Sequence, residues 1–148
     1  QKALGVADRV QLPSEAEWEY ACRAGTLTPF NLGNNITPEQ VNYDASFPYT
    51  NGKKGLNRDR TVRVASLPPN DWGLFEMHAN VWEWCRDGLR EYGAEGTVDP
   101  EGPPSEDRIL RGGSWLHRAQ HARSAYRSSP GIDTRSDCIG FRWSVVSM

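Results

Sequence analysis

Residues 111–142 constrain the fold most, because two glycine- and aromatic-rich blocks enclose a long polar stretch without regular periodicity. The first block is RGGSW at 111–115, and the second is GFR at 140–142. Glycine permits tight turns, and the aromatic rings can anchor the chain in a core. The residues between the blocks follow neither a helical nor a strand pattern. We therefore expect an ordered loop whose side chains bind a ligand or take part in chemistry.

Length and composition favour one loop-rich domain. The chain has 148 residues, of which 14 are Gly and 10 are Pro, and its hydrophobic share is only 37%. Such a chain suits a single domain over residues 1–148 with long ordered loops. The net charge of -2 gives no general attraction to nucleic acid or anionic membranes, and no apolar run is long enough to insert into a bilayer. Seven of the 17 Lys and Arg residues lie in 108–142, where we expect mainly structural ion pairs.

The clearest predicted helix begins at Ser14 and ends at Gly25. Ser14 followed by Glu17 forms a capping-box pattern, and glycine is typical of a helix end. Trp18 and Cys22 share one apolar face of this helix. The three cysteines, Cys22, Cys85 and Cys138, allow at most one internal disulfide, and Cys22 and Cys85 are interpreted as buried thiols.

The rest of the chain predicts short strands between turns. Residues 26–70 are rich in turn-forming side chains, with a strand candidate at 61–65, and another strand is predicted at 108–111. In the block VWEWC, Trp82 and Trp84 would share one face of a strand, which directs Glu83 to the opposite, interior side. A buried carboxylate needs a partner. The alternatives are an arginine, Arg111 or Arg142, and calcium.

Four motifs together identify a family resemblance: LPSEAEWEYACRAG, PPNDWGLFEMHANVWEW, LRGGSW and IGFR. In order and spacing they resemble the formylglycine-generating enzyme (sulfatase-modifying factor) family over residues 12–142. The resemblance implies an α+β fold of C-type lectin-like type, with a small antiparallel sheet, few helices and extensive ordered loops. Family domains normally begin with a further strand and helix that are missing here, so an N-terminal segment of the same domain is one expected partner.

The resemblance also implies a structural calcium site. Its ligands would be the side chains of Glu76 and Glu83 and the backbone carbonyls of Ala79 and Val81. Two carboxylates and two carbonyls suit a hard cation. A second calcium site of the family is not expected, because Lys54 stands at an acidic position.

Catalysis is disfavoured by the residues immediately after the RGGSW block. Catalytic family members use a pair of copper-binding cysteines there, whereas residues 116–122 contain no cysteine. Copper(I) would lack soft ligands, and a substrate thiol would have no partner for a mixed disulfide. We therefore assign no catalytic residue and expect no copper. His117 and His121 form an HxxxH pattern, but without a helical pattern they are interpreted as surface or ligand-contacting residues.

A second branch that this chain resembles is the variable proteins of diversity-generating retroelements, which display a C-terminal segment mutated at the adenines of asparagine-type codons. The segment contains no Lys, Glu or Met, which such codons cannot give. The twelve expected substituted positions are Leu116, His117, Ala119, His121, Tyr126, Ser128, Ser129, Ile132, Thr134, Ser136, Asp137 and Cys138. Together with Trp115, a further aromatic contact, they are the expected ligand-binding residues.

The favoured hypothesis is therefore a non-catalytic binding module with a diversified surface at residues 111–142. Aromatic rings beside small polar side chains favour a protein surface over a small molecule as the partner. Two alternatives stay open: a formylglycine-generating or related oxidase-like enzyme, and an accessory domain of a larger protein. A cell-surface, secreted or viral location would suit the favoured hypothesis. The simplest alternative is that the residues between Trp115 and Gly140 are ordinary loop residues without a binding role.

Overall fold

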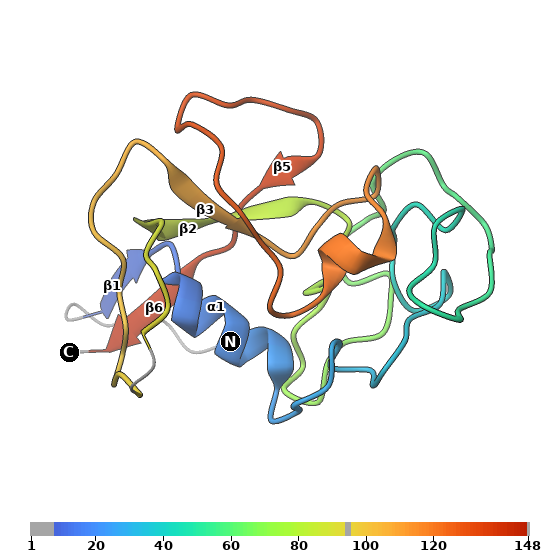
Figure 1. Ribbon diagram of the computed structural model, residues 1–148, viewed down its shortest axis with the longest axis horizontal. Helices are drawn as coiled ribbons and strands as arrows, with labels where there is room; N and C mark the ends of the chain where they lie inside the picture. Colours follow the sequence, from blue (N-terminus) through green and yellow to red (C-terminus); the bar gives the residue numbers. More distant parts are fainter. Residues whose placement is uncertain (1–7, 94–95, 148) are drawn as a thin grey trace.

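The computed structural model describes residues 8–93 and 96–147 (Figure 1). It contains one α-helix, one 3-10 helix and short strands, which confirms the α+β expectation. In chain order the elements are β1 (Asp8–Gln11), α1 (Glu15–Arg23), β2 (Trp82–Gly88), β3 (Arg108–Arg111), η1 (Ala119–Ala122), β4 (Arg127–Ser128), β5 (Ile139–Gly140) and β6 (Ser144–Ser147). Long loops join them, as the composition predicts.

Helix α1 begins and ends as predicted. The Glu17 N–H donates to Ser14 Oγ over 3.1 Å, and the Ser14 N–H donates to Glu17 Oε2 over 2.7 Å, which completes the capping box. The helix ends at Ala24, whose left-handed φ of 46° precedes Gly25 at φ 90°. Trp18 is 1% exposed, so the apolar face of α1 is buried.

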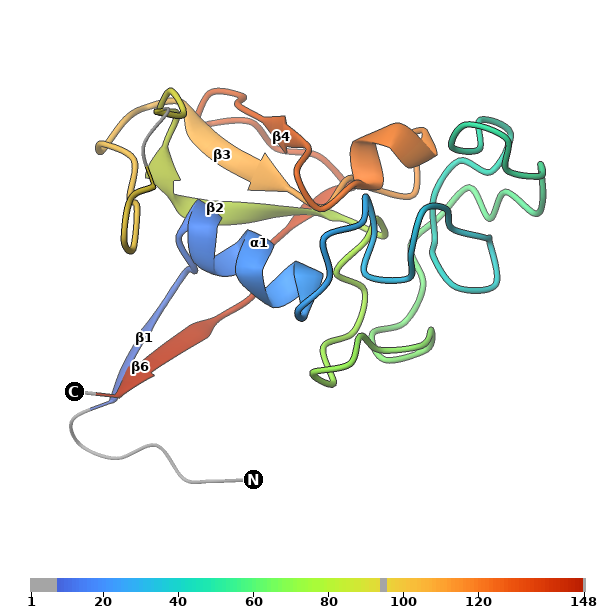
Figure 2. The ribbon, with the colours of Figure 1, turned by 60° about the horizontal axis from the view of Figure 1, so that its bottom comes forward.

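The central sheet has the strand order β4-β3-β2-β5. Strand β3 pairs antiparallel with both β2 and β4, while the short edge strand β5 runs parallel to β2. Strands β1 and β6 pair with each other in a separate two-stranded ribbon, which extends away from the body of the molecule (Figure 2). Both edges of the central sheet, β4 and β5, therefore come from residues 111–142.

The two faces of the central sheet carry different cores. Trp82 packs with Leu110 and Cys138 on one face, and Trp84 lies against the same cluster. On the other face Cys85 and Ile109 pack with Trp18, Cys22 and Met77, so α1 covers that face (Figure 2). The alternation predicted for β2 is confirmed.

The predicted strand at residues 61–65 is wrong. Its backbone donors bond to side chains instead of to a neighbouring strand: the Val62 N–H donates to Asn80 Oδ1 and the Ala65 N–H to Glu76 Oε2, each over 2.9 Å. Nearby loops are ordered by a third core, which includes Phe30, Val41, Tyr43, Ala45, Ala79, Ala119 and Ala122.

Within the described residues, no helix has the length and apolar character needed to cross a bilayer.

Candidate functional site

Residues 111–142 wrap around the end of the sheet. The chain leaves β3, forms η1, returns as edge strand β4, and then loops to β5 at the opposite edge (Figure 1). The turn before η1 depends on Gly112 and Gly113, whose φ values are 95° and 79°. A Cβ on Gly113 would lie only 3.0 Å from the backbone carbonyl of His121. Glycine is thus needed for both the backbone conformation and the close approach to η1.

Four aromatic side chains meet on the sheet face opposite α1: Trp82, His117, His121 and Tyr126, here called the aromatic cluster. The Trp82 ring centroid lies 5.4 Å from that of His117 and 6.0 Å from that of Tyr126, while His121 and Tyr126 are 4.7 Å apart. Trp82 Nε1 donates to His117 Nδ1 over 3.3 Å, and Ser114 Oγ lies 2.7 Å from the same nitrogen. Trp82, a scaffold residue, therefore holds together three expected contact residues, His117, His121 and Tyr126.

Trp82 is the residue of this site that sequence reasoning missed. Its place on β2 indicated a core anchor, and its side chain is indeed only 5% exposed. The sequence did contain a signal for this role. It placed Trp82 and Trp84 on one face of a strand but predicted no helix to cover that face. Residues 111–142 cover it instead.

Both imidazoles of the aromatic cluster favour the neutral form. Burial lowers the pKa of His117, and the neighbouring His121 adds to this effect. Burial also lowers the pKa of His121, together with the positive charges of Arg118 and Arg123. The segment between the two histidines is a 3-10 turn, and the ring planes stand at 87° to each other. The described residues contain no group of three or more His, Cys, Asp and Glu side chains placed to hold a metal.

The expected contact positions differ in exposure. Five are exposed: Leu116, Ile132, Thr134, Ser136 and Asp137. Six are partly buried: Trp115, His117, His121, Tyr126, Ser128 and Ser129. The remaining two, Ala119 at 0% and Cys138 at 6%, are buried and do not reach the surface in this conformation. The candidate binding face, as used below, consists of the eleven exposed and partly buried residues.

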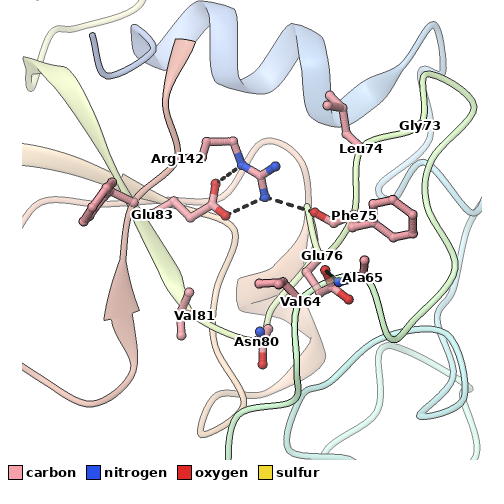
Figure 3. Close-up of a pocket in the computed structure, with 11 residues that line it drawn as sticks. Val64, Ala65, Gly73, Leu74, Phe75, Glu76, Asn80, Val81, Glu83 and Arg142 are labelled. Atoms are coloured by element: carbon pink, nitrogen blue, oxygen red, sulfur yellow. Dashed lines mark hydrogen bonds and ion pairs between the residues drawn. The ribbon is translucent and has the colours of Figure 1, made fainter. Parts of the chain in front are cut away.

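Glu83 pairs with Arg142, which was one of its two predicted arginine partners. Arg142 Nε donates to Glu83 Oε2 and Nη2 to Oε1, each over 2.6 Å (Figure 3). Trp18 Nε1 also donates to Glu83 Oε2, over 2.7 Å. Arg142 Nη2 also donates to the carbonyl of Phe75 over 3.0 Å. This partly buried two-point pair links β2 to the end of residues 111–142.

The other carboxylate of the expected calcium site has separate donors. Glu76 accepts N–H bonds from Ala65, Ser66 and Leu67 at 2.9 to 3.2 Å, so its carboxylate turns away from Glu83 (Figure 3). Both carboxylates line one pocket of about 330 Å³ with Val81. Calcium there would have to displace the Arg142 guanidinium from Glu83. Calcium binding by Glu76, Ala79, Val81 and Glu83 stays a prediction.

The cysteines are unpaired and buried, which confirms the interpretation of Cys22 and Cys85. Burial raises the pKa of Cys22 to about 12 and also raises that of Cys85. Both are therefore thiols near neutral pH rather than the thiolates that nucleophilic or copper chemistry requires. Cys138 Sγ lies 3.1 Å from Ser136 Oγ.

A profile of the sulfatase-modifying factor enzyme 1-like domain matches residues 3–146. The chain belongs to this family. A formylglycine-generating enzyme of Bos taurus is 38% identical over 143 residues, covering 89% of this chain and 38% of that protein. The inactive C-alpha-formylglycine-generating enzyme 2 of Mus musculus is 33% identical, covering 89% of this chain and 42% of that protein.

Two solved structures share the fold. Treponema denticola variable protein 1 superposes with a TM-score of 0.77 at 29% identity, covering 94% of this chain and 48% of that one. PvdO from Pseudomonas aeruginosa gives a TM-score of 0.75 at 29% identity, covering 95% of this chain and 54% of that one. The resemblance to a variable protein is therefore confirmed in structure. The chain spans well under half the length of the curated relatives named above.

Proposed function

We propose that this protein is a non-catalytic binding module whose candidate binding face carries replaceable side chains, as in the variable proteins of diversity-generating retroelements. The exposure pattern carries this proposal: ten of the twelve expected substituted positions are exposed or partly buried. The scaffold beneath them is fixed by Gly112, Gly113 and the Glu83–Arg142 pair. The likeness to variable protein 1 supports the same conclusion.

The chemistry of the candidate binding face suits a protein partner. Leu116 and Ile132 are 55% and 49% exposed, and the aromatic cluster adds the partly buried ring of Tyr126. Short polar side chains such as Thr134 and Ser136 are exposed in the same segment. Exposed apolar groups and rings give contact area, while hydroxyls adapt their hydrogen bonds to the partner.

The oxidase-like alternative is supported by the names of relatives such as the Bos taurus enzyme. Its chemistry has no counterpart in this chain, because residues 116–122 contain no cysteine and the pKa of Cys22 is raised to about 12. The family also includes the mouse relative whose name calls it inactive. An accessory domain could use the same candidate binding face. Its partner would then be another part of the larger protein that contains it.

Comparison of independent copies of the gene tests the proposal. We expect coding differences to concentrate at the twelve substituted positions, while Gly112, Gly113, Gly140 and Phe141 stay constant. We also expect a near-copy of the segment encoding residues 111–142 beside a reverse transcriptase gene. The codons for residues 12–25 provide an internal control for the background rate of change. Copies that are identical throughout residues 111–142, or that vary equally in both segments, would sink the proposal.

A further inference from the structure

A pocket of about 470 Å³ lies next to the candidate binding face. One wall is the loop of residues 46–50, and the other is formed by Arg118 and Gln120 at the start of η1. The two walls are joined by backbone hydrogen bonds: the Asp44 N–H donates to the His117 carbonyl over 3.0 Å, and the Ala119 N–H donates to the Phe47 carbonyl over 3.2 Å. The pocket therefore lies directly beside residues 117–121 of the segment that carries the binding face.

The pocket offers positive charge and hydrogen-bond donors. Lys54, Arg118 and Gln120 line it, and no Asp or Glu is among its lining residues. Neither Lys54 nor Arg118 takes part in the ion pairs found among the described residues. The Arg118 guanidinium lies 4.5 Å from the Phe47 ring centroid. Stacking on the ring restrains the guanidinium and leaves the N–H groups at its edge free to donate.

The loop that contributes Lys54 is also rich in positive charge. Residues 53–63 contain five Lys or Arg and a single acidic residue, Asp59, although the whole chain has a net charge of -2. Arg118 and Arg123 also act on His121, where their charges disfavour the imidazolium. Local charge of one sign attracts partners of the opposite sign and speeds their association.

We propose that this pocket binds an acidic side chain, Asp or Glu, of the protein that contacts the candidate binding face. The Arg118 fork matches a carboxylate through two parallel N–H bonds, and the Lys54 ammonium supplies a second charge. Phe47 and Tyr49 provide apolar walls for the methylene groups and the neighbouring residues of the partner. The inference rests on the proposed function and adds a fixed basic anchor point, for an acidic side chain of the partner, beside replaceable contacts.

A pair of labelled peptides tests this inference with the full chain. The probe is a fluorescein-labelled Gly-Tyr-Glu-Leu-Glu-Gly, and its control carries Gln in place of both Glu residues. Fluorescence anisotropy should show the acidic peptide binding about ten-fold more tightly than the amide peptide. Arg118→Glu and Lys54→Glu should each weaken the acidic peptide by about ten-fold or more. Arg9→Glu makes the same charge change on exposed β1, away from the pocket, and should alter binding less than about two-fold.

Three outcomes would overturn the inference. Equal binding of both peptides would show that the carboxylates are not recognised, and equal losses in Arg118→Glu and Arg9→Glu would show only a net-charge effect. Inorganic phosphate binding at the pocket without any binding of the acidic peptide would assign the pocket to phosphate. Circular dichroism of each variant shows that the fold is retained. If the gene copies vary as expected but the acidic peptide does not bind selectively, this inference alone is removed. If the gene copies are invariant but the acidic peptide binds selectively, the proposed function alone is removed.

Discussion

Replacing Arg111 with Met should lower the free energy of unfolding by about 3–5 kcal/mol, because it removes one partner of a buried ionic network. The Arg111 side chain is 0% exposed, and its guanidinium contacts Glu15, 1% exposed, and Glu19. Arg111 Nη1 also donates to the carbonyls of Ser124 and Tyr126 over 2.8 and 3.0 Å. The substitution removes the Arg111 donor to Glu19 and to both carbonyls, and it leaves the buried Glu15 with Arg127 as its remaining cation. Urea denaturation followed by tryptophan fluorescence measures the loss.

The control for Arg111→Met is Glu101→Gln. The Arg86–Glu101 pair joins the same residue types, but the Glu101 side chain is 53% exposed. Water screens such a pair, so its loss should cost less than about 1 kcal/mol. Similar losses in the two variants would contradict the account of Arg111 as the buried link between α1 and residues 111–142.

Substituting Gly113 with Ala should cost about 2–3 kcal/mol, the second large effect we expect. An alanine at φ 79° is strained, and its Cβ would approach the His121 carbonyl group and the Ala122 Cα to 3.0 and 3.1 Å. Either the turn or η1 must move, which also disturbs the aromatic cluster. Thermal unfolding measures the stability, and the NMR signals of His121 report the displacement.

Gly131→Ala is the matched control in the same segment. A Cβ at Gly131 meets nothing within 4 Å, and its φ lies outside the left-handed region. We expect a change of no more than about 0.5 kcal/mol, since the backbone conformation suits alanine. A loss at Gly131 as large as that at Gly113 would show that segment flexibility, rather than the turn and the close packing, determines the effect.

Local patterns in the sequence predicted the scaffold well. The capping box at Ser14 located α1, and the alternation through Trp82 and Trp84 predicted the two faces of β2. These features depend on neighbouring residues, so short-range chemistry determines them. The strand expected at 61–65 failed because its donors bond to Asn80 and Glu76, a competition between side chains and backbone that a β-propensity pattern does not contain.

The candidate site was only partly predictable. The choice between Arg111 and Arg142 as the partner of Glu83 depends on how distant segments meet, and a pattern within one segment cannot decide it. Likewise, Trp82 joins His117 and Tyr126 only through tertiary packing. Ala119 and Cys138 were expected on the binding face, but they are buried because η1 and the approach to β5 turn these side chains inward.

A stability scan of the full chain tests the central claim, that a fixed scaffold carries replaceable side chains. Single variants at the exposed positions Leu116, Ile132, Thr134, Ser136 and Asp137 would be compared with variants at Gly112, Gly113 and Trp82, using protease resistance of the displayed protein. We predict median losses below about 0.5 kcal/mol at the first set and above about 2 kcal/mol at the second. Equal intolerance of the two sets would contradict the claim.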